Sequence, residues 1–389
     1  MNYKNYRRNT INKKHKFKIK YIFLVLVVVI FVYLVIRYFS LLSAILNPKS
    51  LQSYNTKTVN LTNAYNLKGR LYFVKNNNLW EITGKKVKQI TYTNDVSDIA
   101  ISKNGQKVAY IHFHTNFSNL YQMNINGTGI TRIVNWRDPN INNELWSATP
   151  TYSPNGQYIA YLTNLEKIFT GVDIAGMGIF QISANQVYAS SPATQQASGP
   201  NYYGETDLVN PNPFTGGDAG VTWPNQNFIL YTSYIYWTAN LAQPDSQIML
   251  YDFQTGQSYP VTPLKSEAMQ PRLSPNGKYL AFLERKSNNN ANLYTMQFNL
   301  QNILTHTETS SFTTYKKTLQ TVYVGMESHP TWSPSGNSLA FMTLSNNSFD
   351  IAVIKVTVNH KTNKLNFSDL QHVTHGSTLD STSKMYWLN

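Results

Sequence analysis

The chain has 389 residues, of which 42% are hydrophobic and 13% aromatic, enough for one large domain or two ordinary ones. Its net charge of +14 suggests a nucleic-acid ligand, but eight of the basic residues lie within positions 1–20, which contain no acid. The rest of the chain is only mildly basic, so nucleic acid is not an expected partner. The absence of cysteine excludes disulfides, a thiolate nucleophile and cysteine-ligated metal.

An apolar segment, YIFLVLVVVIFVYLVIRYFSLLSAIL at 21–46, follows this basic tail and contains one charge, Arg37. A helix needs about 20 apolar residues to span a bilayer core, so we expect a single-pass transmembrane signal anchor. The basic residues before it predict a cytoplasmic N-terminus and an extracytoplasmic location for the rest. The alternative is a cleaved signal peptide, whose apolar region is shorter and ends in a small-x-small site that LLSAILN matches poorly. The predicted organisation is a cytoplasmic tail (1–20), the anchor (21–46), a linker (47–64) and one extracytoplasmic domain (65–389).

Beyond residue 50 the apolar runs are short and rich in aromatic residues, as in RLYFV (70–74), NLWEI (78–82) and KVAYI (107–111). Such runs, bounded by turn residues, are typical of β-strands. No convincing helical period appears in this part of the chain. The sequence therefore predicts an all-β domain without helices.

One thirteen-residue phrase occurs four times, and its turn reads SKNG, SPNG, SPNG and SPSG in chain order. Pro fixes φ at the second position of such a turn, and we expect both Asn and Gly to adopt positive φ. An apolar strand begins after each turn. Repeats of about fifty residues that each supply four antiparallel strands predict the blades of a β-propeller. The four copies are DIAISKNGQKVAY (98–110), TPTYSPNGQYIAY (149–161), QPRLSPNGKYLAF (270–282) and HPTWSPSGNSLAF (329–341).

Two further segments bring the predicted number of blades to six. VTWPNQNFILY (221–231) aligns with the phrase although it has lost the glycine, and it begins a fourth blade. Residues 69–93 supply three strands of a first blade but have no phrase before them, whereas DSTSKMYWLN (380–389) resembles the start of the phrase. We therefore expect the C-terminal strand to complete the first blade and close the ring, which leaves few exposed sheet edges.

The phrase PTWSPSGNSLAF, with a following strand such as NLYTM (292–296), resembles the TolB-type, WD-like β-propeller repeat of bacterial proteins. The resemblance covers residues 65–389. The family's Asp-Gly turn is Asn-Gly or Ser-Gly here, a change that the turn chemistry tolerates. The resemblance implies a six-bladed propeller used for binding, and it does not identify the ligand.

Signatures of catalysis are missing from the sequence. Related propellers precede the catalytic domain of prolyl-oligopeptidase-like serine peptidases, but the Gly-x-Ser-x-Gly elbow of that domain does not occur here, nor does a Gly-rich phosphate loop. His372 and His375 have the spacing of metal ligands, but without nearby carboxylates we expect a surface strand end. His112 and His114 alternate onto one face of a strand, where we expect packed or edge positions. We therefore expect no catalytic residue, cofactor or metal.

Two groups of residues are candidates for ligand binding. The residue three positions before the end of each inner strand should face one mouth of the central channel, with its side chain in solvent. Residues 189–220 form a predicted long loop, and paired tyrosines beside acids in it suit a contact surface, although a floppy insertion is the alternative. The channel-mouth candidates are Asp98, Thr149, Gln270, His329 and, in the closing strand, Lys384. The rim candidates are Tyr202, Tyr203, Glu205 and Asp207.

Two functions remain open at this point. The first is a membrane-anchored extracytoplasmic scaffold that binds a protein, a peptide or an envelope polymer such as a glycan. The second is an extracytoplasmic propeller enzyme, of lyase or cyclase type, with its site in the central channel. The lack of a cluster of His and acidic residues in the repeats favours the first.

Overall fold

A computed structural model describes the greater part of the domain and none of residues 1–57. The predicted tail and anchor therefore lie outside the described residues. Within those residues, no helix is both long and apolar enough to cross a membrane. The described ranges are 58–62, 65–136, 145–164, 177–185, 201–202, 205–209, 215–235, 245–287, 290–305 and 308–389.

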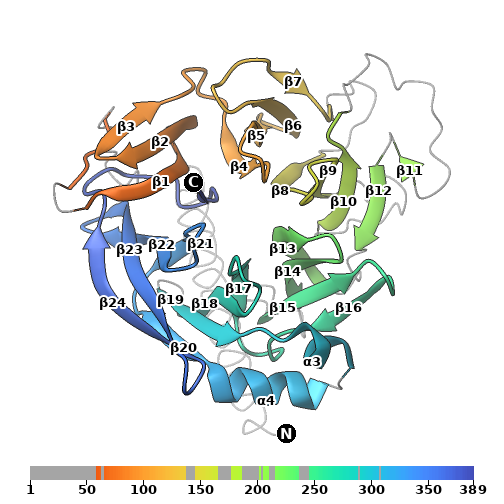
Figure 1. The fold of residues 1–389 in the computed structure, drawn as a ribbon. Coiled ribbons are helices and arrows are strands. Elements are labelled where there is room, and N and C mark those ends of the chain that lie inside the picture. Colours follow the sequence, from red (N-terminus) through yellow and green to blue (C-terminus); the bar gives the residue numbers. More distant parts are fainter. Residues whose placement is uncertain are drawn as a thin grey trace, which may run out of the picture. The chain divides into compact units, whose positions relative to one another are not determined.

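The described residues form a ring of six antiparallel sheets around a central opening, which confirms the predicted six-bladed propeller (Figure 1). Blade 1 consists of β25 (Tyr386–Leu388), β1 (Leu67–Lys75), β2 (Asn78–Gly84) and β3 (Lys86–Gln89), and blade 2 of β4 (Ser97–Ile101), β5 (Lys107–Phe113), β6 (Ser118–Asn124) and β7 (Thr131–Arg132). Blade 3 consists of β8 (Ser147–Tyr152), β9 (Tyr158–Thr163), β10 (Gly178–Ser183), β12 (Glu205–Val209) and β11 (Asn201–Tyr202).

The second half of the ring repeats this order from the innermost strand outwards. Blade 4 consists of β13 (Thr215–Asn225), β14 (Phe228–Ile235), β15 (Asp245–Asp252) and β16 (Gln257–Pro260). Blade 5 consists of β17 (Ala268–Leu273), β18 (Tyr279–Ser287), β19 (Asn290–Gln297) and β20 (Gln320–Tyr323), with α3 (Leu300–Thr305) and α4 (Glu308–Thr318) between its last two strands. Blade 6 consists of β21 (Glu327–Trp332), β22 (Ser338–Ser345), β23 (Ser348–Asn359) and β24 (Lys364–His372).

The apolar core of the ring is shared between neighbouring blades. Six buried clusters are found among the described residues, and each joins two adjacent blades. In the cluster between blades 6 and 1, for example, Leu71 and Phe73 pack with Met342 and Ile351. Because every blade contributes to two clusters, the loss of one blade would expose apolar surface on both of its neighbours.

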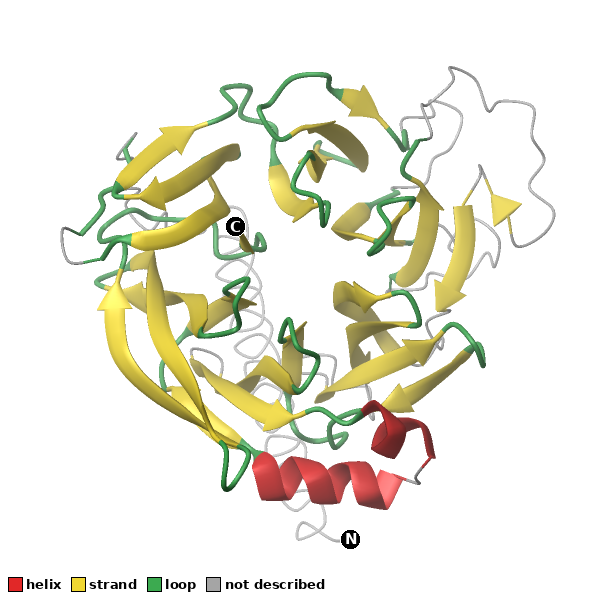
Figure 2. Ribbon diagram, in the orientation of Figure 1, coloured by secondary structure: helices red, strands yellow, loops and turns green. Residues whose placement is uncertain are grey.

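The repeated turns join the two inner strands of a blade and surround the central opening in the view of Figure 2. In the turn of blade 3 the Gly156 N–H donates to the Ser153 carbonyl at 2.8 Å, and Gly156 has a φ of 72°. The prediction for Asn155 is wrong, because its φ is not positive. Its side-chain oxygen instead accepts the Gln157 N–H at 3.0 Å. We call the side of the ring that carries these turns the turn face, and the opposite side, where the inner strands begin, the start face.

The predicted closure of the ring by the C-terminus is confirmed. In the register of β25 against β1, Leu71 lies opposite Trp387 and Tyr72 lies opposite Tyr386. The Trp387 indole is buried and donates its N–H to the Lys68 carbonyl at 2.7 Å. The two ends of the domain thus hold each other in one sheet.

Three features differ from the sequence-based expectations. Helices α3 and α4 were not expected, because α4 has few apolar residues. Tertiary packing stabilises α4 through Tyr315. Its hydroxyl donates to a Glu284 carboxylate oxygen, and its ring lies beside Phe282. Blade 3 has five strands, because residues 201–202 and 205–209 of the predicted long loop pair beyond β10. Residues 58–62, placed in the predicted linker, lie along blade 6, where the Thr62 N–H donates to the Val373 carbonyl at 2.9 Å.

Replacing Trp387 with Ala should lower the free energy of unfolding by about 3–5 kcal/mol, because the substitution leaves a cavity at the seam between blades 6 and 1 and removes an indole hydrogen bond. Denaturant unfolding of the purified domain measures the change. Tyr92→Ala, at a side chain that is 73% exposed, is the matched control and should change stability little. Equal unfolding curves for the two variants would contradict the closure.

Candidate functional site in the central channel

Four of the innermost strands contain an irregularity at the same position, close to the start face. The pairing of β4 with β5 shifts register between Ser97 and Ala100, and β8, β17 and β21 shift at the corresponding places. Such bulges re-aim side chains, here around the channel. The residues at the shift have positive φ, which is costly for a β-branched residue such as Thr149. They are Asp98 (38°), Thr149 (42°), Gln270 (54°) and His329 (45°), so four of the five channel-mouth candidates occupy equivalent positions.

These residues join neighbouring blades through hydrogen bonds. The Thr149 N–H donates to Asp98 Oδ2 at 2.6 Å, from blade 3 to blade 2. The His329 N–H donates to Gln270 Oε1 at 2.7 Å, from blade 6 to blade 5. At both junctions the bulge leaves a backbone N–H without a partner in its own sheet. A side chain of the preceding blade accepts this N–H.

In blade 4 a glycine occupies the bulge position, and the backbone N–H of the next blade still finds a side-chain acceptor. Gly220 of β13 takes the equivalent place, with a φ of 58°, and a Cβ there would lie 3.2 Å from Thr232 Oγ1. Because glycine has no side chain to offer, Thr232 of β14 accepts the Gln270 N–H instead, at 3.1 Å. Sequence analysis missed Gly220 because the segment of blade 4 that was aligned with the repeated phrase, 221–231, begins one residue after it.

Lys384 and His329 connect the closing segment with the rest of the ring. Lys384 Nζ donates to the Pro150 carbonyl of blade 3 at 2.6 Å. His329 Nε2 lies 3.0 Å from the Thr382 carbonyl, so this nitrogen carries the proton. The expectation of solvated side chains is wrong for three candidates, because Asp98 and His329 are each 6% exposed and Lys384 is fully buried. The inter-blade contacts at the bulge remove them from solvent.

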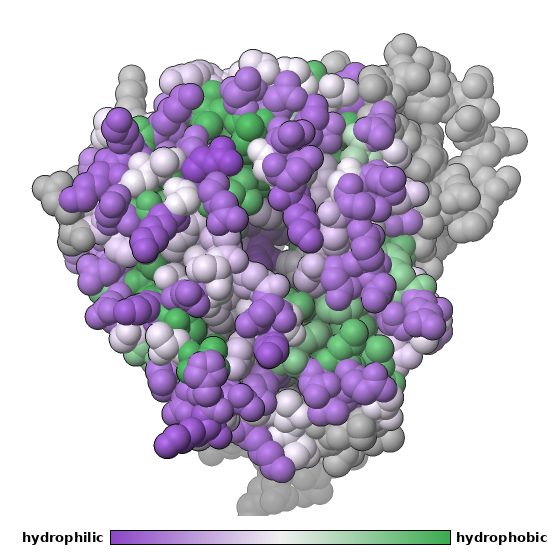
Figure 3. All heavy atoms as spheres, viewed as in Figure 1, coloured by the Kyte–Doolittle hydropathy of each residue, from purple (hydrophilic) through white to green (hydrophobic). Residues whose placement is uncertain are grey.

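Two further channel residues were not predicted. Arg272 of β17 and Tyr386 of β25 lie two positions beyond Gln270 and Lys384 on their strands, and alternation along the strand could have indicated them. Arg272 is half-buried, and its charge acts on Asp98, Tyr386 and His329. Figure 3 shows hydrophilic residues around a hollow at the centre of the ring.

Burial controls the protonation of this group. It raises the pKa of the Asp98 carboxyl above its usual range, against the opposing charge of Lys384. It lowers the pKa of Lys384 to about 7, against the attraction of Asp98. Burial, with the charges of Arg272 and Lys384, lowers the pKa of His329 to about 3, so its imidazole is neutral at physiological pH. Perturbed groups of this kind gather at functional sites.

Among the bulge residues, three buried polar atoms have no hydrogen-bond partner within the described part of the chain. They are Asp98 Oδ1, Thr149 Oγ1 and His329 Nδ1. An unsatisfied buried polar atom costs about 1–3 kcal/mol, so such atoms call for a partner from outside the protein chain. Two acceptors and one hydroxyl, near the Arg272 guanidinium, can bind a polar group that both donates and accepts hydrogen bonds.

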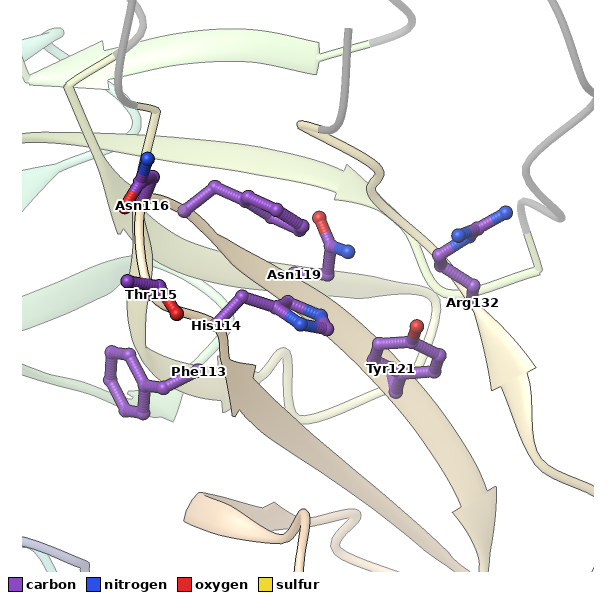
Figure 4. Close-up of a pocket in the computed structure, with 8 residues that line it drawn as sticks. Phe113, His114, Thr115, Asn116, Asn119, Tyr121 and Arg132 are labelled. Atoms are coloured by element: carbon purple, nitrogen blue, oxygen red, sulfur yellow. The ribbon is translucent and has the colours of Figure 1, made fainter. Parts of the chain in front are cut away.

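A pocket of about 710 Å³ lies in blade 2, at the end of the blade that belongs to the start face (Figure 4). The His114 ring points between Asn119 and Tyr121, and Arg132 lies beyond Tyr121. His114 stacks between His112, at 4.1 Å between ring centroids, and Phe117, at 4.2 Å. The predicted packed position of the two histidines is thus observed. The rings of His114 and Phe117 line the pocket together with the side-chain amides of Asn116 and Asn119.

The remaining candidates are not brought to the channel. Tyr202 lies in β11, and Glu205 and Asp207 lie in β12, at the outer side of blade 3. Tyr203 lies outside the described residues. His372 and His375 are exposed at the end of β24. No group of three or more potential metal ligands occurs in the part of the chain that the structure describes.

Comparisons with known proteins agree with this fold. The family model of the dipeptidyl peptidase IV (DPP IV) N-terminal region matches residues 242–368, and no curated protein matches the sequence. TolB from Acinetobacter baumannii is 16% identical over 83% of this chain and 67% of its own, with a TM-score of 0.54. A putative TolB from Agrobacterium tumefaciens (12%, 82% and 93%, TM-score 0.46) and an oligogalacturonate lyase from Vibrio parahaemolyticus (10%, 78% and 74%, TM-score 0.45) are also similar. At 16% identity, the likeness to the Acinetobacter baumannii protein shows the propeller fold alone.

The depressed pKa of His329 predicts a pH dependence of stability. Between its ordinary pKa of about 6.5 and the folded value of about 3, the unfolded chain binds a proton that the folded chain does not. The free energy of unfolding should therefore fall as the pH falls through this window, by about 3 kcal/mol at pH 4. His329→Gln keeps a donor for Thr382 and does not titrate. We expect the wild type to lose stability relative to this variant between pH 7 and pH 4 in denaturant titrations, and parallel curves would contradict the buried neutral imidazole.

Proposed function

We propose, from the premise of a six-bladed propeller of TolB type, that this protein is a binding module that holds a polar partner at the mouth of its central channel. The observation that carries the proposal is the set of unpartnered buried atoms Asp98 Oδ1, Thr149 Oγ1 and His329 Nδ1. All three belong to bulge residues, whose backbones have a costly positive φ. Backbone strain and unpartnered polar atoms at the same positions are typical of a ligand-binding site.

The polar groups of the channel favour a hydroxyl-rich ligand group that can both donate and accept hydrogen bonds. Arg272 donates to the neighbouring Pro271 carbonyl at 3.0 Å, and its guanidinium has further N–H donors to offer a ligand. These donors suit a hydroxyl-rich group, which can also donate its own hydrogens to Asp98 Oδ1 and His329 Nδ1. The blade 2 pocket, on the same start face, offers amide and aromatic contacts to the same partner. A protein, a peptide or a glycan of the envelope fits this combination.

The proposed location is the outer side of the cell membrane, with the propeller tethered by residues 21–46. The support is the sequence of that segment and the basic tail before it. A tethered module with a polar mouth would hold its partner close to the membrane surface.

The second candidate, a lyase or cyclase working in the channel, rests on one observation. Lys384 has a pKa lowered to about 7, which suits a general base. However, Lys384 is fully buried and its Nζ donates to the Pro150 carbonyl, so it is placed to hold the ring together. Binding is therefore the function that the geometry supports best.

Two substitutions separate binding from stability. Thr149→Val keeps the β-branched shape and removes an unpartnered hydroxyl, so the melting temperature should not fall, whereas partner binding should weaken several-fold. Arg272→Gln removes the channel cation and should weaken binding by roughly tenfold or more. The measurement is capture of the partner from detergent-solubilised membranes by the full chain, quantified by mass spectrometry. Lys103→Gln, at an exposed lysine of the turn face, is the control.

If both channel variants retain every protein and polymer that the control retains, the channel does not bind the partner. A reduction with Arg272→Gln that the control shows equally would indicate only surface charge.

The proposed topology is tested by protease treatment of intact cells or spheroplasts. Residues beyond position 50 should be digested, while an epitope tag before residue 20 should be protected until the cells are lysed. Protection of the propeller with digestion of the tag would reverse the orientation.

A further inference from the structure

The two helices inserted in blade 5 border a cavity at the edge of that blade. α3 and α4 lie between β19 and β20, at the outer side of the ring (Figure 1). A cavity of about 420 Å³ lies where α4 meets the turn face of blade 5 and the turn of blade 6 at Asn363. This cavity is separate from the central channel.

The charges around this cavity are positive. Lys278 comes from the repeated turn of blade 5, Lys317 comes from the last turn of α4, and both line the cavity. Both are exposed, and neither forms an ion pair with a carboxylate of the described residues. The exposed lysines Lys316 and Lys364 lie next to lining residues in the chain. No carboxylate is found among the described lining residues.

A lysine in the last turn of a helix can be explained by the helix dipole alone. This explanation covers Lys317 but not Lys278, which comes from a different element. The equivalent positions in the turns of blades 2, 3 and 6 hold the neutral residues Gln106, Gln157 and Asn337. Among these four turns, only that of blade 5, which also has the helical insertion, has a lysine at this position.

The polar groups of the cavity are arranged to donate. The Asn363 carbonyl already accepts from Tyr279 Oη at 3.2 Å and from Gln297 Nε2 at 2.9 Å, so it offers little to a further donor. Asn299 Oδ1 accepts the Asn302 N–H at 3.1 Å, which leaves the Asn299 NH₂ group as its contribution. Two ammonium groups and the amide donors of the lining form an environment for an oxyanion.

We propose that this cavity binds a phosphate group carried on a small polyol or sugar. A single phosphate would not fill 420 Å³, and the aromatic side chains of Tyr279 and Phe298 in the lining suit the carbon skeleton of an ester. Free phosphate and a phosphate ester share the chemistry that the lysines recognise. Only the ester has a carbon skeleton that can contact Tyr279 and Phe298, so the affinities for the two ligands distinguish them.

The test is calorimetric titration of the detergent-solubilised full chain with inorganic phosphate and with glycerol 3-phosphate. Both probes should bind more weakly as the salt concentration rises, and the ester should bind more tightly. The double variant Lys278→Gln/Lys317→Gln should lose roughly tenfold or more in affinity for both probes. Lys103→Gln, in the corresponding turn of blade 2, should retain affinity within about twofold, because Lys103 does not line the cavity.

Circular dichroism melting of the variants shows whether they remain folded. If the double variant melts early, Lys278→Gln alone, which leaves the helix unchanged, decides the result. The proposal is overturned if neither probe binds the wild type, or if Lys103→Gln loses as much affinity as the double variant. Equal affinity for the two probes would restrict the site to free phosphate and would overturn the assignment of a polyol skeleton.

Discussion

The pairing of β25 with β1 is the interaction on which the rest of this structure depends. It places the last residues of the chain inside the first blade, and the core between blades 6 and 1 is complete only when Trp387 lies there. The same segment brings Lys384 and Tyr386 to the channel, next to Asp98, and the Ser383 hydroxyl accepts the Ile99 N–H at 3.3 Å. Closure of the ring and construction of the channel site are therefore a single event.

The channel is more polar than the stability of the ring requires. Buried charges such as Asp98 and Lys384 lose their hydration, and replacement of buried ionic groups by apolar side chains is often neutral or stabilising. The hydrogen bonds between blades recover part of this loss, as between Asp98 and the Thr149 N–H, but they leave other atoms of the same side chains without partners. A ring selected for stability alone would not need these groups. Their presence is the physical reason for proposing a binding function for the channel.

Most of the fold could be predicted from the sequence because the propeller is a repeated local pattern. The turn residues, the apolar strand after each turn and the Trp387 that matches Trp332 of the phrase were enough to predict six blades and their closure. The helices and the fifth strand of blade 3 could not be predicted in this way, because they depend on contacts that occur once, such as that between Tyr315 and Glu284.

The candidate site was only partly predictable. Alignment of the phrases located Asp98, Thr149, Gln270, His329 and Lys384, since equivalent positions in a repeat have equivalent places in the ring. It could not show that the strands bulge at the first four positions or that Lys384 reaches the Pro150 carbonyl, so it wrongly predicted solvated side chains for Asp98, His329 and Lys384. Arg272 was missed because only one blade has a charged residue at its position, and a search for a shared pattern does not select a single exception.

The channel contains buried polar atoms without hydrogen-bond partners among the described residues, and ¹⁵N NMR of His329 tests most directly whether a bound partner supplies them. We predict a neutral ring with the proton on Nε2 in the free protein at pH 7, and a shift of the Nδ1 resonance towards that of a hydrogen-bonded acceptor when the captured partner is added. A protonated imidazole in the free protein, or an Nδ1 resonance that does not change with the partner bound, would contradict the account.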